Sequence, residues 1–250
     1  MTLPVPHEAP VFALDAGNTR IKWGLHAGGR WVFRGATATK DAERLGRDWP
    51  ALPEGTIARA SNVAGLEAQQ AIYSACDRHG LLLSLIASKA AQLGVTSGYR
   101  DPGQLGTDRW AALVAAHAAA EGHKLVVNAG TALTVDALAG DGRFLGGLIV
   151  PGPALMRRSL GAGTAGLKLT EGHFDPLPRS TPDAITTGSV QAAVGAVERM
   201  MSAMAEAGAP AGTILLSGGA AGELLPHLPM PVTLNDNLVL DGVVLIARAG

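Results

Sequence analysis

The first forty residues show apolar runs broken by short turns, which is the pattern of successive strands. VFALDAG is almost continuously apolar, whereas RIKWGLH and WVFRGAT interleave apolar and polar positions. Ala27, Gly28 and Gly29 lie between the last two runs, and adjacent glycines favour a tight hairpin turn. The pattern therefore predicts a meander of three antiparallel strands.

Strands and helices alternate after the meander, as they do in an α/β layer. Thr107 and Asp108 are residue types that cap helix starts. The predicted elements as far as residue 122 are a helix-like segment at 41–48, a strand at TIARASNV, a helix over 65–78 ended by Gly80, a strand at LLLSLIA, and an Ala-rich helix between Gly106 and Gly122.

A meander pattern then begins again at residue 124. The remaining predicted elements are strands at KLVVNAG, TALTVDAL and RFLGGLIVPG with a turn at 140–142, a helix near 153–160, a polar Pro-rich stretch to Pro182, a helix to about Ala205, a strand at TILLSGG, a short helix, a strand at PVTLN and a last helix.

The two meanders open alike. Aligned without gaps, DAGN at 15–18 matches NAGT at 128–131. Duplication of a unit of three strands and a helix explains the likeness. We therefore expect two halves, residues 1–112 and 113–250, with a ligand cleft lined by the turn of each half. A chance likeness between two glycine-containing hairpins is the alternative.

Composition narrows the class of protein. A formal net charge of −1 and a pI near 6.7 give no long-range field that would collect nucleic acid or an anionic membrane, so an anionic ligand has to be held locally. Cys76 is the sole cysteine, which excludes an intrachain disulfide and a zinc site of several cysteines. The first ten residues, MTLPVPHEAP, have no basic n-region and no apolar core, and the longest apolar runs are too short to span a bilayer. We expect a soluble, cytoplasmic protein.

The stretch from Asp15 to Lys22 combines a carboxylate, a turn and an ammonium group. Gly17 lets the backbone turn with its N–H groups facing outward, and Asn18 and Thr19 add side-chain donors, so the turn suits phosphate oxygens. Lys22 can bring a positive charge to the same place. Asp15 would repel phosphate unless a divalent cation lay between them. The stretch predicts Mg²⁺ and a polyphosphate, and the alternative is an Asx turn beside a solvated lysine.

A second turn at Gly130 and Thr131 supports the phosphate interpretation, because one polyphosphate held from both halves would explain the duplication. The SGG turn at 217–219 suits close approach by a nucleoside. No Gly-x4-Gly-Lys-Ser/Thr loop occurs, and no GxGxxG follows the first strand. No GxSxG elbow supports a serine hydrolase, and the seven histidines show no paired ligand spacing.

SGYRDPGQLGTDRW, at 97–110, carries the other chemical signal. Arg109 offers a planar fork for a carboxylate, and Asp108 can accept a proton from a hydroxyl. A small acid that bears a hydroxyl would satisfy both side chains. Phosphoryl transfer needs mainly positioning and charge neutralisation, with an aspartate orienting the attacking oxygen. A plain N-cap role for Asp108 is the alternative.

Together these motifs resemble type III pantothenate kinases, a family that includes homologues described as Bvg accessory factor. The resemblance extends from about Val11 to Arg248. It is carried by DAGNTRIKWG at 15–24, NAGTALTVD at 128–136, YRDPGQLGTDR at 99–109, which is similar to the family's YxxPxxLGxDR, and GGLIVPG at 146–152 with TPDAITTG at 181–188.

The resemblance implies an α/β fold of duplicated RNase H-like domains, in the acetate and sugar kinase/Hsp70/actin superfamily, and a homodimer. It also implies a reaction in which ATP and pantothenate give ADP and 4′-phosphopantothenate, the first step toward coenzyme A. The implied cofactors are Mg²⁺ and a monovalent cation, K⁺ or NH₄⁺.

The resemblance implies roles for individual residues. Asp108 becomes the general base, and Thr181 is similar to the threonine that reaches substrate across the dimer interface. The residues implied to contact pantothenate are Tyr99, Gly106, Thr107 and Arg109. Those implied to hold the ATP phosphates and their magnesium are Asp15, Gly17, Asn18, Thr19, Lys22, Gly130 and Thr131.

Asn128 departs from the family pattern, in which the second phosphate motif usually opens with aspartate. An amide still offers an oxygen ligand but removes a charge. We therefore expect a changed affinity or selectivity at a monovalent-cation site, with catalysis retained because Asp15 and Asp108 are present. Two other functions stay open: a regulatory protein on a kinase scaffold, and another kinase or phosphohydrolase of the same superfold.

Overall fold

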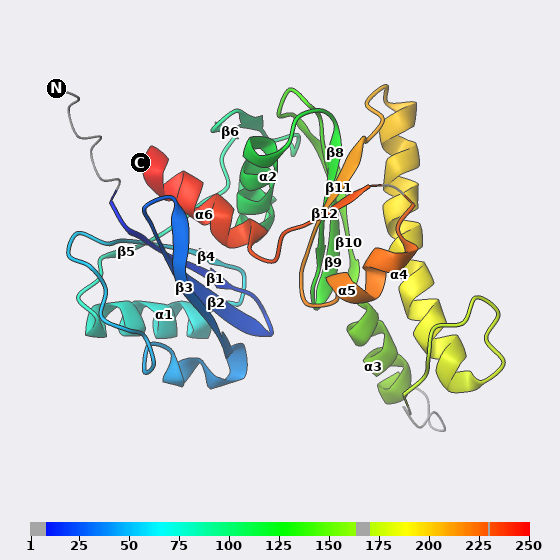
Figure 1. Ribbon diagram of the computed structural model, residues 1–250, viewed down its shortest axis with the longest axis horizontal. Helices are drawn as coiled ribbons and strands as arrows, with labels where there is room; N and C mark the ends of the chain where they lie inside the picture. The colour runs from blue at the N-terminus through cyan, green and yellow to red at the C-terminus, as the bar shows by residue number, and fades with distance from the viewer. Residues whose placement is uncertain (1–8, 164–170, 230) are drawn as a thin grey trace. The chain divides into compact units, whose positions relative to one another are not determined.

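The computed structural model describes residues 9–163, 171–229 and 231–250, which form two compact units (Figure 1). The expected halves, 1–112 and 113–250, divide the sequence at one point. The observed units differ from them, because the final helix belongs with the first sheet. The first unit contains the described residues of Met1–Leu93, Tyr99–Ala115 and Leu238–Gly250, and the second those of Gly94–Gly98 and Ala116–Asn237.

The sheet of the first unit has the strand order β3-β2-β1-β4-β5. β1 pairs antiparallel with β2, and β2 pairs antiparallel with β3, so the predicted meander is confirmed. β4 and β5 continue the sheet in parallel with β1. The strands are β1 (Val11–Ala16), β2 (Arg20–Ala27), β3 (Arg30–Ala38), β4 (Ile57–Asn62) and β5 (Leu83–Leu85).

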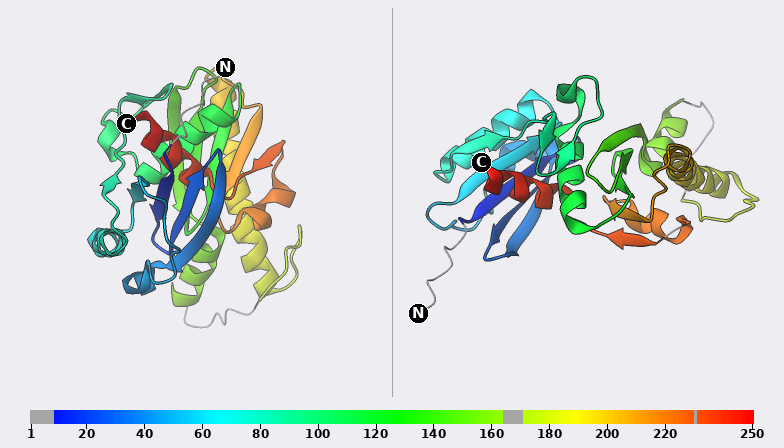
Figure 2. Two further views of the ribbon diagram at one scale, coloured as in Figure 1. Left: turned by 60° about the vertical axis from the view of Figure 1, so that its left-hand side comes forward. Right: turned by 90° about the horizontal axis from the view of Figure 1, so that it is seen from above.

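Helices cover both faces of this sheet (Figures 1 and 2). Phe12 and Leu14 form a core with residues of α1, whereas Val11 and Ala13 are equally buried on the other face, where α6 contacts β1. Asp15 shares the face of Val11 and Ala13, because side chains alternate along a strand. The helices are η1 (Thr39–Arg44), α1 (Leu66–Arg78), η2 (Pro102–Gln104), α2 (Thr107–Ala119) and α6 (Leu238–Ala249).

The sheet of the second unit repeats the first, with the order β10-β9-β8-β11-β12 and the same strand directions. The predicted duplication is therefore confirmed at the level of topology. Its strands are β8 (Lys124–Ala129), β9 (Ala132–Leu138), β10 (Phe144–Pro151), β11 (Thr213–Ser217) and β12 (Val232–Leu234). Two short strands are β6 (Ala91–Gln92) and β7 (Val95–Thr96).

The helices of the second unit pack on one another and on its sheet. α4 contacts β8, β9 and β10, and α3 packs along α4. The described part of the chain contains no helix long and apolar enough to cross a membrane. The helices are α3 (Pro153–Gly163), α4 (Thr181–Glu206), α5 (Ala221–Leu224) and η3 (Leu225–His227).

Two predicted elements differ in detail from the observed ones. The segment 41–48 contributes only the end of the 3₁₀ helix η1, in which Asp41 leaves helical geometry at a φ of −110°. LLLSLIA forms a strand over three residues, because β5 lies at the sheet edge and pairs with β4 alone. The other predicted helices and strands are present, with ends that shift by a few residues.

Candidate active site

Asp15 lies near the end of β1, beside two charged residues. Lys22 is its cross-strand partner on β2, and Asp108 at the start of α2 is close enough to act on its charge. Its Oδ1 atom is buried and has no hydrogen-bond partner within the described residues. Burial, and then the charge of Asp108, raise the pKa of Asp15 to about 7, while Lys22 acts in the opposite direction. A divalent cation would stabilise such a carboxylate in its ionised form.

The turn after β1 is held in place by its own backbone and by η1. The Gly17 N–H donates to the Arg20 carbonyl at 3.0 Å, which closes the turn. Thr39 Oγ1 donates to the Gly17 carbonyl at 2.7 Å, and the Thr39 N–H donates to the Thr19 carbonyl at 3.0 Å. Asn18 and Thr19 are exposed on this fixed turn. The turn can therefore present polar groups to a ligand without first becoming ordered.

Asp108 lies inside the first turn of α2 rather than at its cap, because the helix already begins at Thr107. Its Oδ1 accepts the Arg109 N–H at 2.8 Å. A Cβ on Gly106 would lie 2.6 Å from that Oδ1, so the folded-back carboxylate needs glycine there. Burial raises the pKa of Asp108, although the N–H and the guanidinium of Arg109 act to lower it. A higher pKa makes this carboxylate a stronger base once it is ionised.

Arg109 is buried at 5% exposure and is paired with Tyr99. Its Nη1 donates to the Tyr99 hydroxyl at 2.9 Å, and its guanidinium carbon lies 5.6 Å from the centre of the tyrosine ring. The planar fork is thereby oriented before any ligand arrives. A guanidinium fixed in this way can hold a carboxylate through two parallel hydrogen bonds.

Ser61 joins the sheet to the start of α2, and no motif in the sequence identified it. Its side chain is completely buried, and its Oγ lies 2.9 Å from Thr107 Oγ1. On β4 it stands opposite Asp15, just as Ser217 on β11 stands opposite Asn128. A comparison of the two halves of the sequence that extended to β4 and β11 would have found a serine at the same position in both strands.

The second turn lacks the charges of the first. The cross-strand partner of Asn128 is Thr134, at the position that a lysine occupies in the first unit. The Gly130 N–H donates to the Ala132 carbonyl at 3.0 Å, two residues further on, whereas the matching bond in the first turn spans three residues. The second turn is thus one residue shorter, and the gapless alignment ends at Thr131. This turn offers backbone groups and an amide instead of a carboxylate and an ammonium.

Thr181 is separate from the second turn. It is the first residue of α4, and the Ser180 Oγ caps that helix by accepting the Asp183 N–H at 3.3 Å. Thr181 lines a groove of about 820 Å³ between α3 and α4, together with Met156, Leu160, Arg179 and Ile185 among others, and no residue of the second turn lines it. The structure therefore brings Asp15, Lys22, Tyr99 and the 106–109 segment together in the first unit, while Thr181 lies elsewhere in the second.

The donor set of the first unit fits Mg²⁺ bound together with a polyphosphate. No group of three or more His, Cys, Asp or Glu side chains suited to a metal occurs among the described residues. Magnesium in phosphoryl-transfer sites usually takes one or two carboxylates, and its other ligands are water and phosphate oxygens. Asp15 supplies such a carboxylate with an unpartnered Oδ1. The arrangement can hold a metal-bound phosphate chain beside a base and an anion-binding arginine.

Known proteins resemble this chain in sequence and in fold. A sequence model of the family described as type III pantothenate kinase matches residues 11–203. The type III pantothenate kinase of Dechloromonas aromatica is 43% identical over 236 residues, which cover 93% of this chain and 97% of the relative.

Two solved structures share the architecture at lower identity. A conserved Baf family protein from Campylobacter jejuni has a TM-score of 0.59 at 17% identity, covering 95% of this chain and 98% of that one. A protein from Sinorhizobium meliloti assigned as a 2-dehydro-3-deoxygalactonokinase has a TM-score of 0.57 at 17% identity, covering 96% and 98%. These likenesses concern the fold, and the predicted α/β fold with two sheet domains of the sugar kinase and actin type is confirmed.

The raised pKa of Asp15 predicts how stability varies with pH in metal-free buffer. The folded protein keeps this proton up to about pH 7, whereas the unfolded chain loses it near the ordinary aspartate pKa of 3.8. The folded state then binds the extra proton between these values, so the contribution of Asp15 to stability falls as the pH rises toward 7. Replacement of Asp15 by Asn should remove this loss. At pH 8 the midpoint of thermal unfolding should rise by about 3 °C.

The comparison is a set of thermal unfolding curves from pH 5 to pH 8 in the presence of a chelator. The gain in the Asp15→Asn variant should shrink toward pH 5. Asp77→Asn, on the exposed surface of α1, is the matched control and should run parallel to the parent protein. If the unfolding midpoint of Asp15→Asn also varies with pH in parallel with that of the parent, the raised pKa of Asp15 is contradicted.

Proposed function

The chain belongs to the type III pantothenate kinase family, and we propose that it transfers the γ-phosphate of ATP to the primary hydroxyl of pantothenate. The products are ADP and 4′-phosphopantothenate, the first intermediate toward coenzyme A. The observation that carries the proposal is that Asp108 lies close enough to Asp15 to raise its pKa, because this brings the first turn and the segment that would receive the acceptor to one place. We also propose that the reaction takes place in the cytoplasm, a reducing compartment that suits the free thiol of Cys76.

The phosphate turn of the first unit is assigned to ATP. Gly17 presents the backbone, Asn18 and Thr19 add donors, and Lys22 places an ammonium beside the phosphate oxygens. Asp15 is assigned to magnesium, which would neutralise charge on the phosphates. Gly130 and Thr131 of the second unit are assigned to the same nucleotide through their backbone groups. The tight, pre-ordered first turn supports this assignment, because phosphoryl transfer depends mainly on positioning.

Pantothenate is assigned to the segment between Tyr99 and Arg109. The guanidinium of Arg109 would bind its carboxylate, in the orientation that Tyr99 already fixes. Gly106 and Thr107 would line the same place. The Oδ1 atom of Asp108 is engaged by the Arg109 N–H, so the other carboxylate oxygen is assigned to take the proton of the attacking hydroxyl. The raised pKa of Asp108 supports its role as general base.

A monovalent cation, K⁺ or NH₄⁺, completes the proposed set of cofactors. Asn128 is assigned to its site through the amide oxygen, which carries no charge. Loss of the negative charge should weaken the attraction for any cation. The proposal is therefore that turnover still depends on the cation, at a higher concentration than a carboxylate ligand would require.

We assign Thr181 to the site of a second copy of the chain, in a homodimer. Support comes from exposed apolar side chains on the adjoining elements, Ile149 on β10 at 62% exposure and Leu160 on α3 at 43%. Leu160 also lines the groove beside Thr181. Exposed apolar surface is a common feature of protein interfaces.

The first test is ADP release by the purified protein with Mg-ATP, with and without pantothenate, in K⁺ buffer and then in Na⁺ buffer. We expect ADP release that depends on pantothenate and is faster in K⁺. Release in K⁺ alone would support the cation site at Asn128. Folded protein that binds ATP but shows no dependence on pantothenate in either salt would point to another acceptor or to a regulatory role.

Asp108→Asn separates base catalysis from binding. The amide keeps the shape of the side chain but takes no proton, so kcat should fall by about 10²–10⁴-fold while the binding of pantothenate changes little and the protein stays folded at the assay temperature. Lys22→Ala is the contrasting variant, in which the loss of a charged contact should raise the KM for ATP about tenfold. Unchanged turnover in Asp108→Asn would remove Asp108 from the mechanism.

Mixing two inactive variants tests the shared site. If Thr181 serves the partner chain, a heterodimer of Asp108→Asn and Thr181→Ala contains one intact site and one doubly altered site. Mixed and re-equilibrated variants should therefore recover activity toward a quarter of the parent value, the statistical share of intact sites under random pairing. Each variant incubated alone is the control. A mixture no more active than the sum of the two separate variants would place Thr181 in its own chain's site or outside the site.

A further inference from the structure

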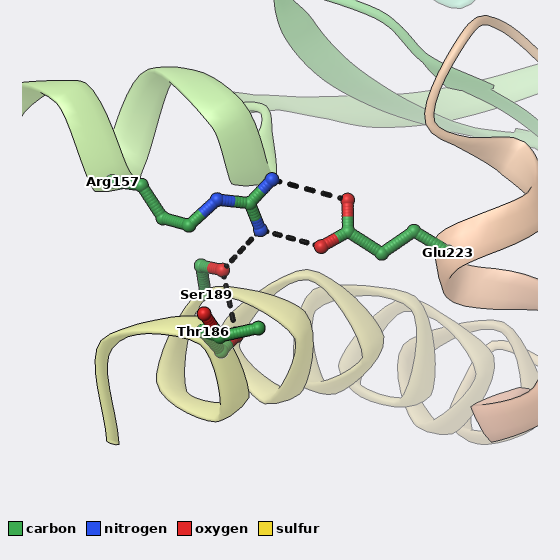
Figure 3. A network of polar contacts seen from close by, with 4 residues as sticks. All are labelled: Arg157, Thr186, Ser189 and Glu223. Carbon is green, nitrogen blue, oxygen red and sulfur yellow. Dashed lines mark hydrogen bonds and ion pairs between the residues drawn. The ribbon is translucent and has the colours of Figure 1, made fainter. Parts of the chain in front are cut away.

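An ion pair in the second unit joins three helices near the glycine turns. Arg157 on α3 contacts Glu223 on α5 with both arms of its guanidinium, at 2.5 Å and 3.3 Å. Its Nη1 also donates to Ser189 Oγ on α4 at 2.9 Å, and that hydroxyl donates to the Thr186 carbonyl at 2.8 Å (Figure 3). Arg157 and Glu223 are 27% and 30% exposed. The pair is therefore mostly buried, and removing one partner leaves the other charge poorly solvated.

The Glu223 end of the pair is connected to the SGG turn. α5 follows that turn directly, and the Ala220 N–H donates to the Ala129 carbonyl at the end of β8 at 2.9 Å. Gly218 has a φ of +99°, and a Cβ there would lie 2.4 Å from the Ala129 oxygen. The SGG turn thus lies directly on the backbone that leads into Gly130. Any shift of α5 would move this turn against the second phosphate turn.

The Arg157 end of the pair is connected to the second phosphate turn itself. The Gly152 N–H, one residue before α3, donates to the Thr131 carbonyl at 2.8 Å. A Cβ on Gly152 would lie 2.1 Å from the Gly130 oxygen, so α3 starts in direct contact with the turn. Both α3 and α5 therefore begin beside residues 129–131. Arg157, one turn into α3, and Glu223, near the start of α5, tie the two helices to each other. The contacts form a closed ring around the second turn.

From this ring we propose that Arg157 and Glu223 are positioning residues that fix the SGG turn relative to the Gly130-Thr131 turn. The inference rests on the proposed function, because it matters only if both turns contact ATP. Neither residue needs to touch the nucleotide. Their pairing sets the angle between α3 and α5, and Ser189 fixes the guanidinium from the side of α4. A pair with this role acts on the affinity for nucleotide and leaves the pantothenate contacts of the first unit unchanged.

The test compares Glu223→Gln, Arg157→Met and Arg157→Lys with the parent protein. The dissociation constant of Mg-ATP, measured by titration calorimetry, should rise about tenfold in Glu223→Gln and Arg157→Met, a size typical of coupled neighbouring residues. Arg157→Lys keeps the charge but loses the two-armed contact, so its dissociation constant should lie between those of Arg157→Met and the parent. The KM for pantothenate should change less than about twofold, within the scatter expected for distant sites.

Asp141→Asn is the matched control. Asp141 and Arg143 form an ion pair of 2.7 Å in the same unit, on a hairpin where their side chains are 58% and 64% exposed. Breaking this exposed pair should leave the affinity for ATP unchanged. Thermal unfolding of every variant separates lost structure from lost positioning. A variant that unfolds below the assay temperature is set aside, and Glu223→Gln and Arg157→Lys, the smaller changes, decide the result.

The outcomes distinguish the two proposals. A lower unfolding midpoint with an unchanged dissociation constant for ATP would mean that the pair is structural only, and would overturn the inference. Parent protein that binds ATP without turnover of pantothenate would overturn the proposed function, while the variants' affinity for ATP would still decide the role of the pair. Parent protein that binds no ATP would overturn both.

Discussion

The carboxylate of Asp108 lies close enough to Asp15 to raise its pKa, and the organisation of the first unit follows from that constraint. Burial raises the pKa of both groups, and in Asp15 the neighbouring negative charge adds to the effect. Lys22 and Arg109 oppose the shift only in part. The folded protein therefore disfavours the ionised carboxylates, and a divalent cation bound with a phosphate chain would stabilise that form. Binding energy from such stabilisation is available only to a ligand of the right charge, which gives the site selectivity as well as affinity.

The rest of the first unit keeps these two groups in place. Asp15 is fixed by a strand that is buried on both faces, and the turn after it is tied down by Thr39. Asp108 is fixed by the start of α2, which Ser61 joins to the sheet. Gly106 leaves the space into which the carboxylate folds back. A strand end and a helix start are rigid elements, and rigid elements hold reacting groups to the accuracy that phosphoryl transfer needs.

The duplicated unit has diverged in chemistry while keeping its topology. The first copy carries the charged side chains, whereas the second has Asn128 and Thr134 at the matching strand positions and a turn one residue shorter. What the second copy offers is backbone, packed so closely that glycine is required at 152 and 218. The position of that backbone depends on the helices around the turn, which the Arg157–Glu223 pair ties together. One copy thus carries charged side chains at its turn, and the other carries main-chain groups held by close packing.

The sequence alone was sufficient for the order of the elements, the duplication and the residue types of the phosphate turn, because each depends on local pattern: apolar periodicity, glycine turns and short motifs. It also identified Asp108 and Arg109, since their spacing in one segment carries the resemblance. Other features depend on contacts between residues distant in the chain, which no local pattern records. The C-terminal helix α6 packs on the first sheet, far from its neighbours in the sequence. The strand register sets Asp15 opposite Lys22 and Asn128 opposite Thr134. Burial in the folded chain raises the pKa of Asp15 and Asp108. The same holds for Ser61 and for the ring closed by Arg157 and Glu223, because a partner 46 or 66 residues away is chosen only by the folded chain.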